Sequence, residues 1–363
     1  MADIVSIATA VPQYCHRQND ILTFMQEAYQ LGETDKRKLA FLYHRSDIKT
    51  RYSVVPDYSN VEERTFIPDN KQEPFPNIDQ RMEMYGRHAL PLAVEAITKC
   101  LNSKMATAEI THLITVSCTG MSAPGLDLEL VEALALPPDI YRTSVNFMGC
   151  YAAIHAMKMA GMICNANPVT ANVMIVCVEL CTLHFQKEFN MDSAASSLLF
   201  ADGAAAILIS NKPTRSHTLK LKGFYSHVDF KGKNDMSWKL SSKGFLMTLS
   251  SYVPQLIQAD IATLVENALK QHDIPVSDIS HWCIHPGGKA ILDAIQKQLA
   301  LSADSMEYSK AVLAGYGNMS SATILFVLKN MMDALESDDK NANIFGVAFG
   351  PGLTMETFIA VKE

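Results

Sequence analysis

The 363-residue sequence contains no long apolar run and no excess of positive charge. No apolar stretch reaches the roughly eighteen residues that a membrane span needs, so we expect no transmembrane helix. Lysine and arginine total 31 against 38 aspartate and glutamate, a formal charge of −7. This balance argues against nucleic acid or an anionic membrane as a partner. Residues 1–7 lack the basic and then apolar layout of a secretory signal, and we expect them to form a first strand.

Cysteine pairs with the CxxC spacing are also absent, although the chain has eight cysteines. These cysteines are scattered through mostly apolar stretches, which indicates buried thiols in a reducing compartment rather than a disulfide framework. We therefore expect a cytoplasmic protein. The i,i+4 pairs His281/His285 and Cys177/Cys181 have no carboxylate partners, so we expect no bound metal.

Charged residues make up only 19% of the chain and hydrophobic residues 48%, which excludes a disordered or low-complexity protein. Short β-rich runs at 112–118, 145–148, 172–179 and 204–210 alternate with helical patterns such as residues 151–164. This alternation predicts a layered α/β fold.

Three pairs of segments recur at nearly the same separation along the chain. Residues 109–112 match 278–281 at a separation of 169 residues, and residues 149–153 match 317–321 at 168. Residues 172–179 match 343–349 at about 171. Matches in register at one separation indicate an internal duplication. We predict two similar halves, residues 1–212 and 213–363, joined in the polar stretch 210–217 and facing each other across a pseudo-two-fold axis.

The duplication brings three polar side chains toward one place. Cys150 and Asn318 occupy equivalent positions at the start of two apolar helices. His285 ends a strand, just before the sharp turn 286–288. If the halves superpose, all three side chains face the cleft between them, where the active sites of α/β folds are usually assembled.

These three residue types suit acyl transfer. A cysteine at a helix N-terminus near an imidazole is expected to have a lowered pKa, and its thiolate attacks acyl thioesters. Asn318 and His285 can both donate hydrogen bonds to the thioester oxygen, an oxyanion role worth about 3–4 kcal/mol per donor. The alternatives are structural: Cys150 as a small buried side chain, His285 as part of a strand-ending turn, and Asn318 as a helix cap.

Five motifs, in order, give the sequence a family resemblance. They are Gly149-Cys-Tyr-Ala-Ala153, Leu199-Phe-Ala-Asp-Gly-Ala-Ala205, His285-Pro-Gly-Gly288, Tyr316-Gly-Asn-Met-Ser-Ser321 and Phe349-Gly-Pro-Gly-Leu353. With them, residues 5–357 resemble the type III polyketide synthases, the chalcone- and stilbene-synthase-like family of the thiolase superfamily. The resemblance implies a thiolase-like five-layered αβαβα fold made of two duplicated halves. It also implies a homodimer, with Met121 as the nearest candidate for an interface loop.

The same resemblance implies the activity. An acyl-CoA starter would load onto Cys150, and malonyl-CoA would lose CO2 while His285 and Asn318 hold its thioester oxygen. The acyl group would grow by decarboxylative Claisen condensation and cyclise to a pyrone- or resorcinol/phloroglucinol-type product. The substrates would be CoA thioesters, with no cofactor. The alternatives are a ketoacyl-carrier-protein synthase III-like condensing enzyme and an inactive scaffold that acts by binding.

Other positions match substrate-binding residues of the family. Phe200 matches an aromatic gate, for which a core phenylalanine is the structural alternative. Met247 aligns near a second gate, which is a phenylalanine elsewhere in the family. The positions that match cavity-lining residues are Ser117, Cys118, Thr119, Glu179, Cys181, His184 and Ser320.

Basic residues near the cleft are the candidate contacts for CoA phosphates. Lys38 and Arg45 match such positions, and Phe41 replaces the basic residue between them. Lys289, just after the His285 turn, is expected to compensate for that loss. A solvated charged face is the structural alternative for all three.

Overall fold

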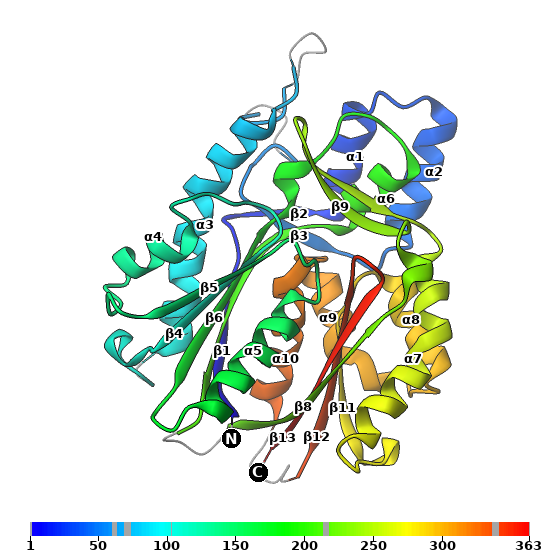
Figure 1. Cartoon of the computed structure of the whole chain (residues 1–363). Coiled ribbons are helices and arrows are strands. Elements are labelled where there is room, and N and C mark those ends of the chain that lie inside the picture. Colours follow the sequence, from blue (N-terminus) through cyan, green and yellow to red (C-terminus); the bar gives the residue numbers. More distant parts are fainter. Residues whose placement is uncertain are drawn as a thin grey trace.

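The computed structural model describes residues 2–59, 64–68, 74–102, 104–212, 218–335 and 341–362. Nine strands among these residues form one large sheet (Figure 1). In spatial order they are β11 (Ile279–Ile284), β12 (Asn343–Gly350), β13 (Thr354–Lys362), β8 (Leu219–Val228), β1 (Ala2–Ala10), β7 (Asp202–Ser210), β6 (Asn172–Leu180), β4 (His112–Ser117) and β5 (Tyr141–Asn146).

The sheet contains the same arrangement of strands twice. On one side β4 runs parallel to β6, β6 is antiparallel to β7, and β7 is antiparallel to β1. On the other side β11 runs parallel to β12, and β13 and β8 follow with antiparallel pairings. A short ladder between Ala2–Ile4 and Leu219–Leu221 joins the two sets. The topology confirms the predicted duplication, and β5 is added to the first set at the edge of the sheet.

Helices lie between the two sets of strands and cover their outer faces (Figure 1). α5 (Ala152–Ala166) and α10 (Thr323–Ala334) lie between the sets. α3 (Ile78–Leu101) covers the first set, and α7 (Val253–Lys270) and α8 (Lys289–Gln298) cover the second. These are the five layers of the predicted thiolase-like αβαβα fold.

The composition of these helices fits their positions. α5 buries small and apolar side chains such as Ala152, Ala156 and Met157. A helix enclosed by two sheets must be apolar around most of its circumference, whereas the outer α3 needs only one apolar face. α3 begins at a capping box in which Asn77 and Gln80 each accept the other's backbone N–H at 3.0 Å.

Smaller elements close one end of the sheet (Figure 1). They are β2 (Tyr14–Arg17), β3 (Thr50–Ser53), α1 (Gln18–Ala28), α2 (Glu33–His44), α6 (Met191–Leu199), β9 (Met236–Ser241) and β10 (Gly244–Leu249). Of the predicted junction between the halves, residues 213–217 lie outside the described residues. Within the part of the chain that the structure describes, no helix combines the length and apolar character needed to cross a bilayer.

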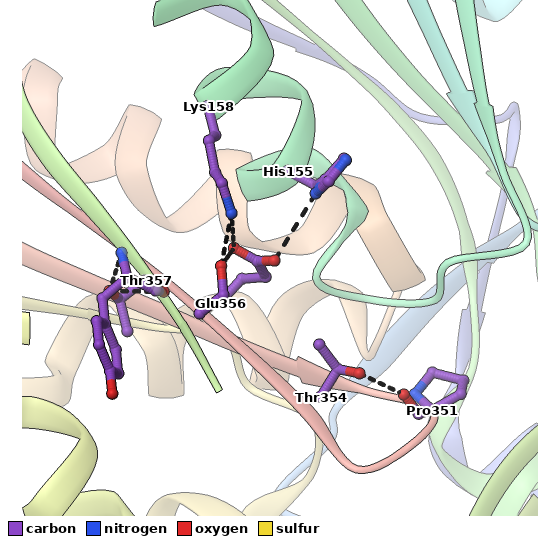
Figure 2. A network of polar contacts seen from close by, with 8 residues as sticks. His155, Lys158, Pro351, Thr354, Glu356 and Thr357 are labelled. Atoms are coloured by element: carbon purple, nitrogen blue, oxygen red, sulfur yellow. Dashed lines mark hydrogen bonds and ion pairs between the residues drawn. The ribbon is translucent and has the colours of Figure 1, made fainter. Parts of the chain in front are cut away.

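A buried carboxylate on β13 ties α5 to the second set of strands (Figure 2). Glu356 accepts hydrogen bonds from Lys158 Nζ at 3.3 Å and from Ser226 Oγ at 2.7 Å. His155 Nδ1 lies 3.7 Å from the other carboxylate oxygen of Glu356. These contacts hold the helix that follows Cys150 against the C-terminal strands.

Replacing Lys158 with methionine is expected to lower the free energy of unfolding by about 2 kcal/mol, because a mostly buried carboxylate loses its cation. The matched control is Lys99→Met, since the Lys99–Glu95 pair is exposed, at 54% and 46% of the side-chain surface. Its loss is expected to cost less than about 0.5 kcal/mol. Urea unfolding measures both variants, and equal losses would contradict the structural role of the Glu356 contacts.

Candidate active site

A pocket, here called the central cavity, is lined by residues of both halves. Cys150, His285 and Asn318 all line it, although they come from three separate segments of the chain. The structure thus brings together the three side chains that the sequence repeat placed at one cleft. The wall is mostly apolar, with Phe349 and Pro351 among its members.

The backbone before Cys150 requires glycine. Gly149 has a φ of +89°, and a Cβ added there would lie 2.3 Å from Cδ of Pro351. A larger residue would therefore be strained and would displace the turn that closes the cavity. The N–H of Gly149 donates to Cys118 Sγ at 3.0 Å, which further fixes the position of Cys150.

The acidity of Cys150 differs from the sequence-based expectation. α5 begins at Ala152, so Cys150 lies just before the helix rather than in its first turn. Burial raises the pKa of the Cys150 thiol to about 12, although hydrogen bonds with Ser320 and Asn318 act in the opposite direction. The prediction of a lowered pKa was wrong because desolvation of the thiolate outweighs the effect of the helix end. The resting cysteine is therefore a neutral thiol.

His285 is a buried imidazole at the end of β11. Its backbone N–H donates to Val347 O at 2.9 Å, which continues the pairing of β11 with β12. Among the described residues, neither ring nitrogen has a hydrogen-bond partner. Burial lowers the pKa of His285 to about 3, so the ring is neutral. An unsatisfied buried polar group costs about 1–3 kcal/mol, and such groups are rare unless a ligand or reaction uses them.

The Asn318 side chain is oriented by its neighbours. Its Oδ1 accepts the Ser320 N–H at 2.9 Å and the Thr323 hydroxyl at 3.3 Å. Cys150 Sγ lies 4.0 Å from the same oxygen. With Oδ1 occupied, the NH2 group is the part of the amide left to donate to a ligand. The expected helix start at Asn318 is displaced: α10 begins at Thr323, after a 3₁₀ turn over Ser320–Ala322.

The backbone of Asn318 is also fixed by the segment around Phe200. Its N–H donates to Leu199 O, and its carbonyl accepts the Ala201 N–H, both at 2.9 Å. These two bonds form an isolated bridge between Asn318 and Phe200. The predicted gate residue Phe200 therefore sits beside the predicted oxyanion donor, and it lines the central cavity.

Most of the predicted lining residues line the central cavity or the cavity next to it, but Ser117 and Glu179 line neither. Cys118, Thr119, Cys181, Met247 and Ser320 line the central cavity. Ser117 instead lines a separate hollow beside Met121, where its hydroxyl accepts a hydrogen bond from Tyr85 at 2.9 Å. It ends β4, whose alternation directs its side chain away from Cys150.

Glu179 lies behind the cavity wall rather than on it. It is fully buried, and its carboxylate accepts the Cys118 N–H at 2.9 Å, the Thr119 hydroxyl at 2.9 Å and the Ser321 hydroxyl at 2.5 Å. Burial raises its pKa to about 7, against the opposing effect of these hydrogen bonds. The carboxylate thus orients two wall residues instead of contacting a ligand.

Sequence reasoning missed one part of the wall. Met236 and Trp238 of β9 and Leu249 of β10 line the central cavity beside Met247. Their alternate spacing, at positions 236 and 238 and at 247 and 249, is the signal of a hairpin with one apolar face.

The candidate phosphate contacts lie near the surface, and none of the three lines the central cavity. Lys38 pairs with Asp35 at 3.0 Å, and both are exposed. The Arg45 guanidinium lies 5.3 Å from the ring centre of Phe41. Lys289 is ion-paired with Asp47 in a separate surface hollow, and this hydrogen bond raises the pKa of Lys289. Arg45 lies near enough to Lys289 for its positive charge to oppose this rise in the pKa of Lys289.

His184 lines a second cavity and has a defined tautomer. Its Nδ1 accepts the Phe245 N–H at 3.1 Å. Nε2 therefore carries the proton and donates to Thr119 O at 2.7 Å. Burial lowers the pKa of His184 to about 3, so this ring is also neutral.

His184 and His285 are expected to make the protein less stable as the pH falls below 6.5. The unfolded chain binds a proton at each histidine there, whereas the folded rings stay neutral until the pH nears 3. Each contributes a slope of up to about 1.4 kcal/mol per pH unit. Urea unfolding at pH 7.5 and 5.5 measures this loss, and His285→Asn should reduce it. The same loss in that variant would contradict a neutral, buried His285.

The sequence matches the family models of chalcone and stilbene synthases, with the N-terminal domain over residues 1–213 and the C-terminal domain over residues 227–362. The chain is 31% identical to the alpha-pyrone synthesis polyketide synthase-like Pks18 of Mycobacterium tuberculosis, covering 98% of this chain and 90% of the relative. It is 30% identical to type III polyketide synthase A of Arabidopsis thaliana, covering 98% and 91%.

Solved structures agree with the sequence matches. The crystal structure of PKS-I from the brown alga Ectocarpus siliculosus has a TM-score of 0.91 at 29% identity and covers 100% of this chain and 98% of that one. The type III polyketide synthase domain of Steely1 from Dictyostelium has a TM-score of 0.90 at 26% identity, covering 99% of both. This chain, with its duplicated fold and its cavity lined by cysteine, histidine and asparagine, belongs to the chalcone and stilbene synthase family of type III polyketide synthases.

Proposed function

We propose that this acyltransferase loads an acyl group from a CoA thioester onto Cys150, extends it with malonyl-CoA and releases a cyclised product. One observation carries the proposal, namely the hydrogen-bonding groups that three polar side chains leave available in the central cavity. A thiol, an imidazole whose nitrogens have no partners among the described residues, and an amide with its NH2 group left over line the same space.

In the loading step, His285 accepts the proton of the Cys150 thiol, and the thiolate attacks the carbonyl carbon of the starter thioester. The bond to Cys150 forms and the bond to CoA breaks, so the CoA thiolate leaves and takes the proton from the imidazolium. Because burial disfavours an isolated thiolate and an isolated imidazolium alike, the two charges arise together, as a pair.

In the extension step, the thioester oxygen of malonyl-CoA accepts hydrogen bonds from Asn318 Nδ2 and from an N–H of His285. Loss of CO2 leaves an enolate whose negative charge lies on that oxygen. The enolate carbon then attacks the acyl carbon on Cys150, a C–C bond forms, and the Cys150 thiolate is released. This sequence of steps uses CoA thioesters as substrates and calls for no cofactor.

We propose a pyrone- or resorcinol/phloroglucinol-type product, because a poly-β-keto chain carries carbonyl oxygens and acidic carbons at the spacing that closes six-membered rings. The name of the Mycobacterium relative, which refers to alpha-pyrone synthesis, supports the first of these. For the CoA phosphates we propose Arg45 and Lys289, since these two cations are neighbours. A phosphate would take the place of Asp47, the present ion-pair partner of Lys289.

We also propose that the protein is a homodimer, with β5 at the interface. β5 is the edge strand of the sheet, and its Tyr141 side chain is 72% exposed. An exposed edge with a large apolar side chain is the kind of surface that a second chain covers. Light scattering at micromolar concentration is expected to give twice the 40.0 kDa chain mass. The mass of a single chain would refute the dimer.

Mutation is expected to separate the two half-reactions. Cys150→Ala should abolish acyl loading and condensation but leave malonyl-CoA decarboxylation measurable, because the enolate needs only its oxyanion donors. Asn318→Ala should slow decarboxylation about a hundred- to a thousandfold while Cys150 still acquires an acyl group. His285→Ala should impair both steps. CO2 release and intact-protein mass report on the two steps separately.

The matched control is Cys164→Ala, which removes a buried thiol of α5 away from the central cavity and should leave both steps intact. Normal decarboxylation by Asn318→Ala would reduce Asn318 to a structural role and overturn the assignment. Malonyl-carrier protein serves as the comparison substrate, and turnover as efficient as with malonyl-CoA would favour a ketoacyl-carrier-protein synthase.

A further inference from the structure

The position of Asn318 depends on the segment 198–201, to which its backbone is bonded. Three consecutive carbonyl groups of that segment accept hydrogen bonds from different parts of the chain. Leu199 O accepts the N–H of Asn318 at 2.9 Å, and its neighbours Leu198 O and Phe200 O each accept a side-chain donor. Whatever holds those two neighbours therefore also holds Asn318.

The two side-chain donors are Gln18 and Arg51. Gln18 Nε2 donates to Leu198 O at 2.9 Å, and Arg51 Nη1 donates to Phe200 O. The two side chains are also bonded to each other, because Arg51 Nε donates to Gln18 Oε1 at 2.9 Å. A planar guanidinium holds its donors in a fixed relative direction. Arg51 therefore fixes Phe200 O relative to Gln18.

Arg51 also contacts the other side of the bridge, at the residue before Asn318. Gly317 has a φ of +69°, and a Cβ added there would lie 2.9 Å from both Cγ and Cδ of Arg51. Glycine lets the backbone pass this close to the arginine stem. The stem of Arg51 thus lies against the backbone that leads into Asn318, while its guanidinium binds the segment opposite.

The strand that carries Arg51, β3, is itself anchored to both segments of the bridge. The Thr50 hydroxyl donates to Gly315 O at 2.8 Å, three residues before Asn318. The Val54 N–H, just after β3, donates to the Asp202 carboxylate at 2.9 Å. Arg51 therefore reaches the bridge from a fixed support.

The burial of Arg51 fits such a role. Its side chain belongs to a residue that is only 4% exposed, and burying a cation is unfavourable unless polar contacts replace the lost water. Nε and Nη1 supply such contacts to Gln18 and Phe200 O. A hydrogen bond from a charged donor is stronger than one from a neutral donor, which suits a group that keeps a carbonyl in one position.

We infer that Arg51 is a positioning residue for the decarboxylation of malonyl-CoA, and that it acts by fixing the segment to which Asn318 is bridged. The inference rests on the oxyanion role of Asn318 proposed above. Arg51 lines the neighbouring cavity rather than the central one, so it reaches the thioester oxygen only through the Asn318 amide. Acyl loading does not use that amide, and the effect of Arg51 is confined to the extension step.

The first test measures CO2 release from malonyl-CoA by Arg51→Met, a variant that keeps an apolar stem and removes the donors. We expect kcat to fall about ten- to a hundredfold with KM little changed, because a displaced donor weakens binding of the transition state more than binding of the substrate. Acyl loading, followed by intact-protein mass, should keep its native rate. Native decarboxylation by the folded variant would overturn the inference.

The matched control is Arg81→Met. Arg81 is 1% exposed and donates to two backbone carbonyls, Pro76 O and Leu183 O, so its replacement removes a comparable set of buried contacts. It lines neither of the two cavities. Arg81→Met is expected to be less stable to urea and yet to keep the native kcat per folded molecule. An equal loss of kcat in both variants would assign Arg51 to stability alone and overturn the inference.

A double variant shows whether Arg51 acts through Asn318. In Asn318→Ala the amide that Arg51 positions is already gone, so adding Arg51→Met is expected to slow decarboxylation by less than about threefold more. A further loss as large as in the native background would mean that Arg51 acts by another route, such as contact with the substrate. That result would overturn the inference.

If Arg51→Met does not fold, Arg51→Lys is the second variant. Lysine keeps the cation but lacks the forked donors, so it cannot hold Gln18 and Phe200 O together. It is expected to slow decarboxylation in the same direction, by about threefold or more. A native kcat in the lysine variant would overturn the inference equally.

Hydrogen exchange separates this inference from the reaction itself. The N–H groups of Asn318 and Ala201 form the bridge, and their exchange with deuterium reports how firmly it is held without any substrate. Arg51→Met is expected to speed this exchange about tenfold or more, whereas Arg81→Met should leave it native. Native exchange in Arg51→Met would overturn the inference. Faster exchange, with no decarboxylation by the native protein, would support the positioning of Asn318 and overturn only the proposed function.

Discussion

The enclosure of α5 and α10 between two sets of strands is the constraint on which the site depends. A helix enclosed in this way has little access to water, so a polar side chain near its start must find a partner in the protein or in a ligand. The duplication places the starts of both helices at one cavity, with Cys150 before one and Asn318 before the other. His285 joins them because its strand continues the second copy of the same sheet. The site is therefore a property of the paired halves and of neither half alone.

The same enclosure sets the protonation states. Burial keeps both the Cys150 thiol and the His285 imidazole neutral, because the charged form of each would lose its hydration. A low-dielectric cavity also strengthens each hydrogen bond to an oxygen on which negative charge develops. Glu179 extends this arrangement from behind the wall, where it orients the backbone and hydroxyl groups of neighbouring residues. Its carboxylate is satisfied by the protein, in contrast to the open nitrogens of His285.

Much of this architecture could be predicted from the sequence. Segments that recur at one constant separation predict two halves with the same order of strands and helices. That separation alone predicted that Cys150 and Asn318 occupy equivalent positions in the two halves. The strand order of the sheet confirms the duplication. The acidity of Cys150 could not be predicted, since it depends on how much surrounding protein excludes water. The family resemblance placed Glu179 on the cavity wall, but the direction of a side chain at a strand end depends on its hydrogen-bond partners. Trp238 was missed because its place in the cavity wall depends on contacts with His184 and Cys118, which are remote in sequence.

The position of β13 between β12 and β8 has a consequence for how the protein is made. During synthesis β8, β11 and β12 all emerge before the strand that joins them, so the second half of the sheet stays open until residues 354–362 are available. The turn that contacts Gly149 belongs to the same late segment, since Pro351 lies in the connection between β12 and β13. The cysteine is thus present in the growing chain long before the surroundings that dehydrate it. A ribosome-bound intermediate would carry an accessible, ordinary thiol, and the buried environment of Cys150 would come into being only with the last strand of the sheet.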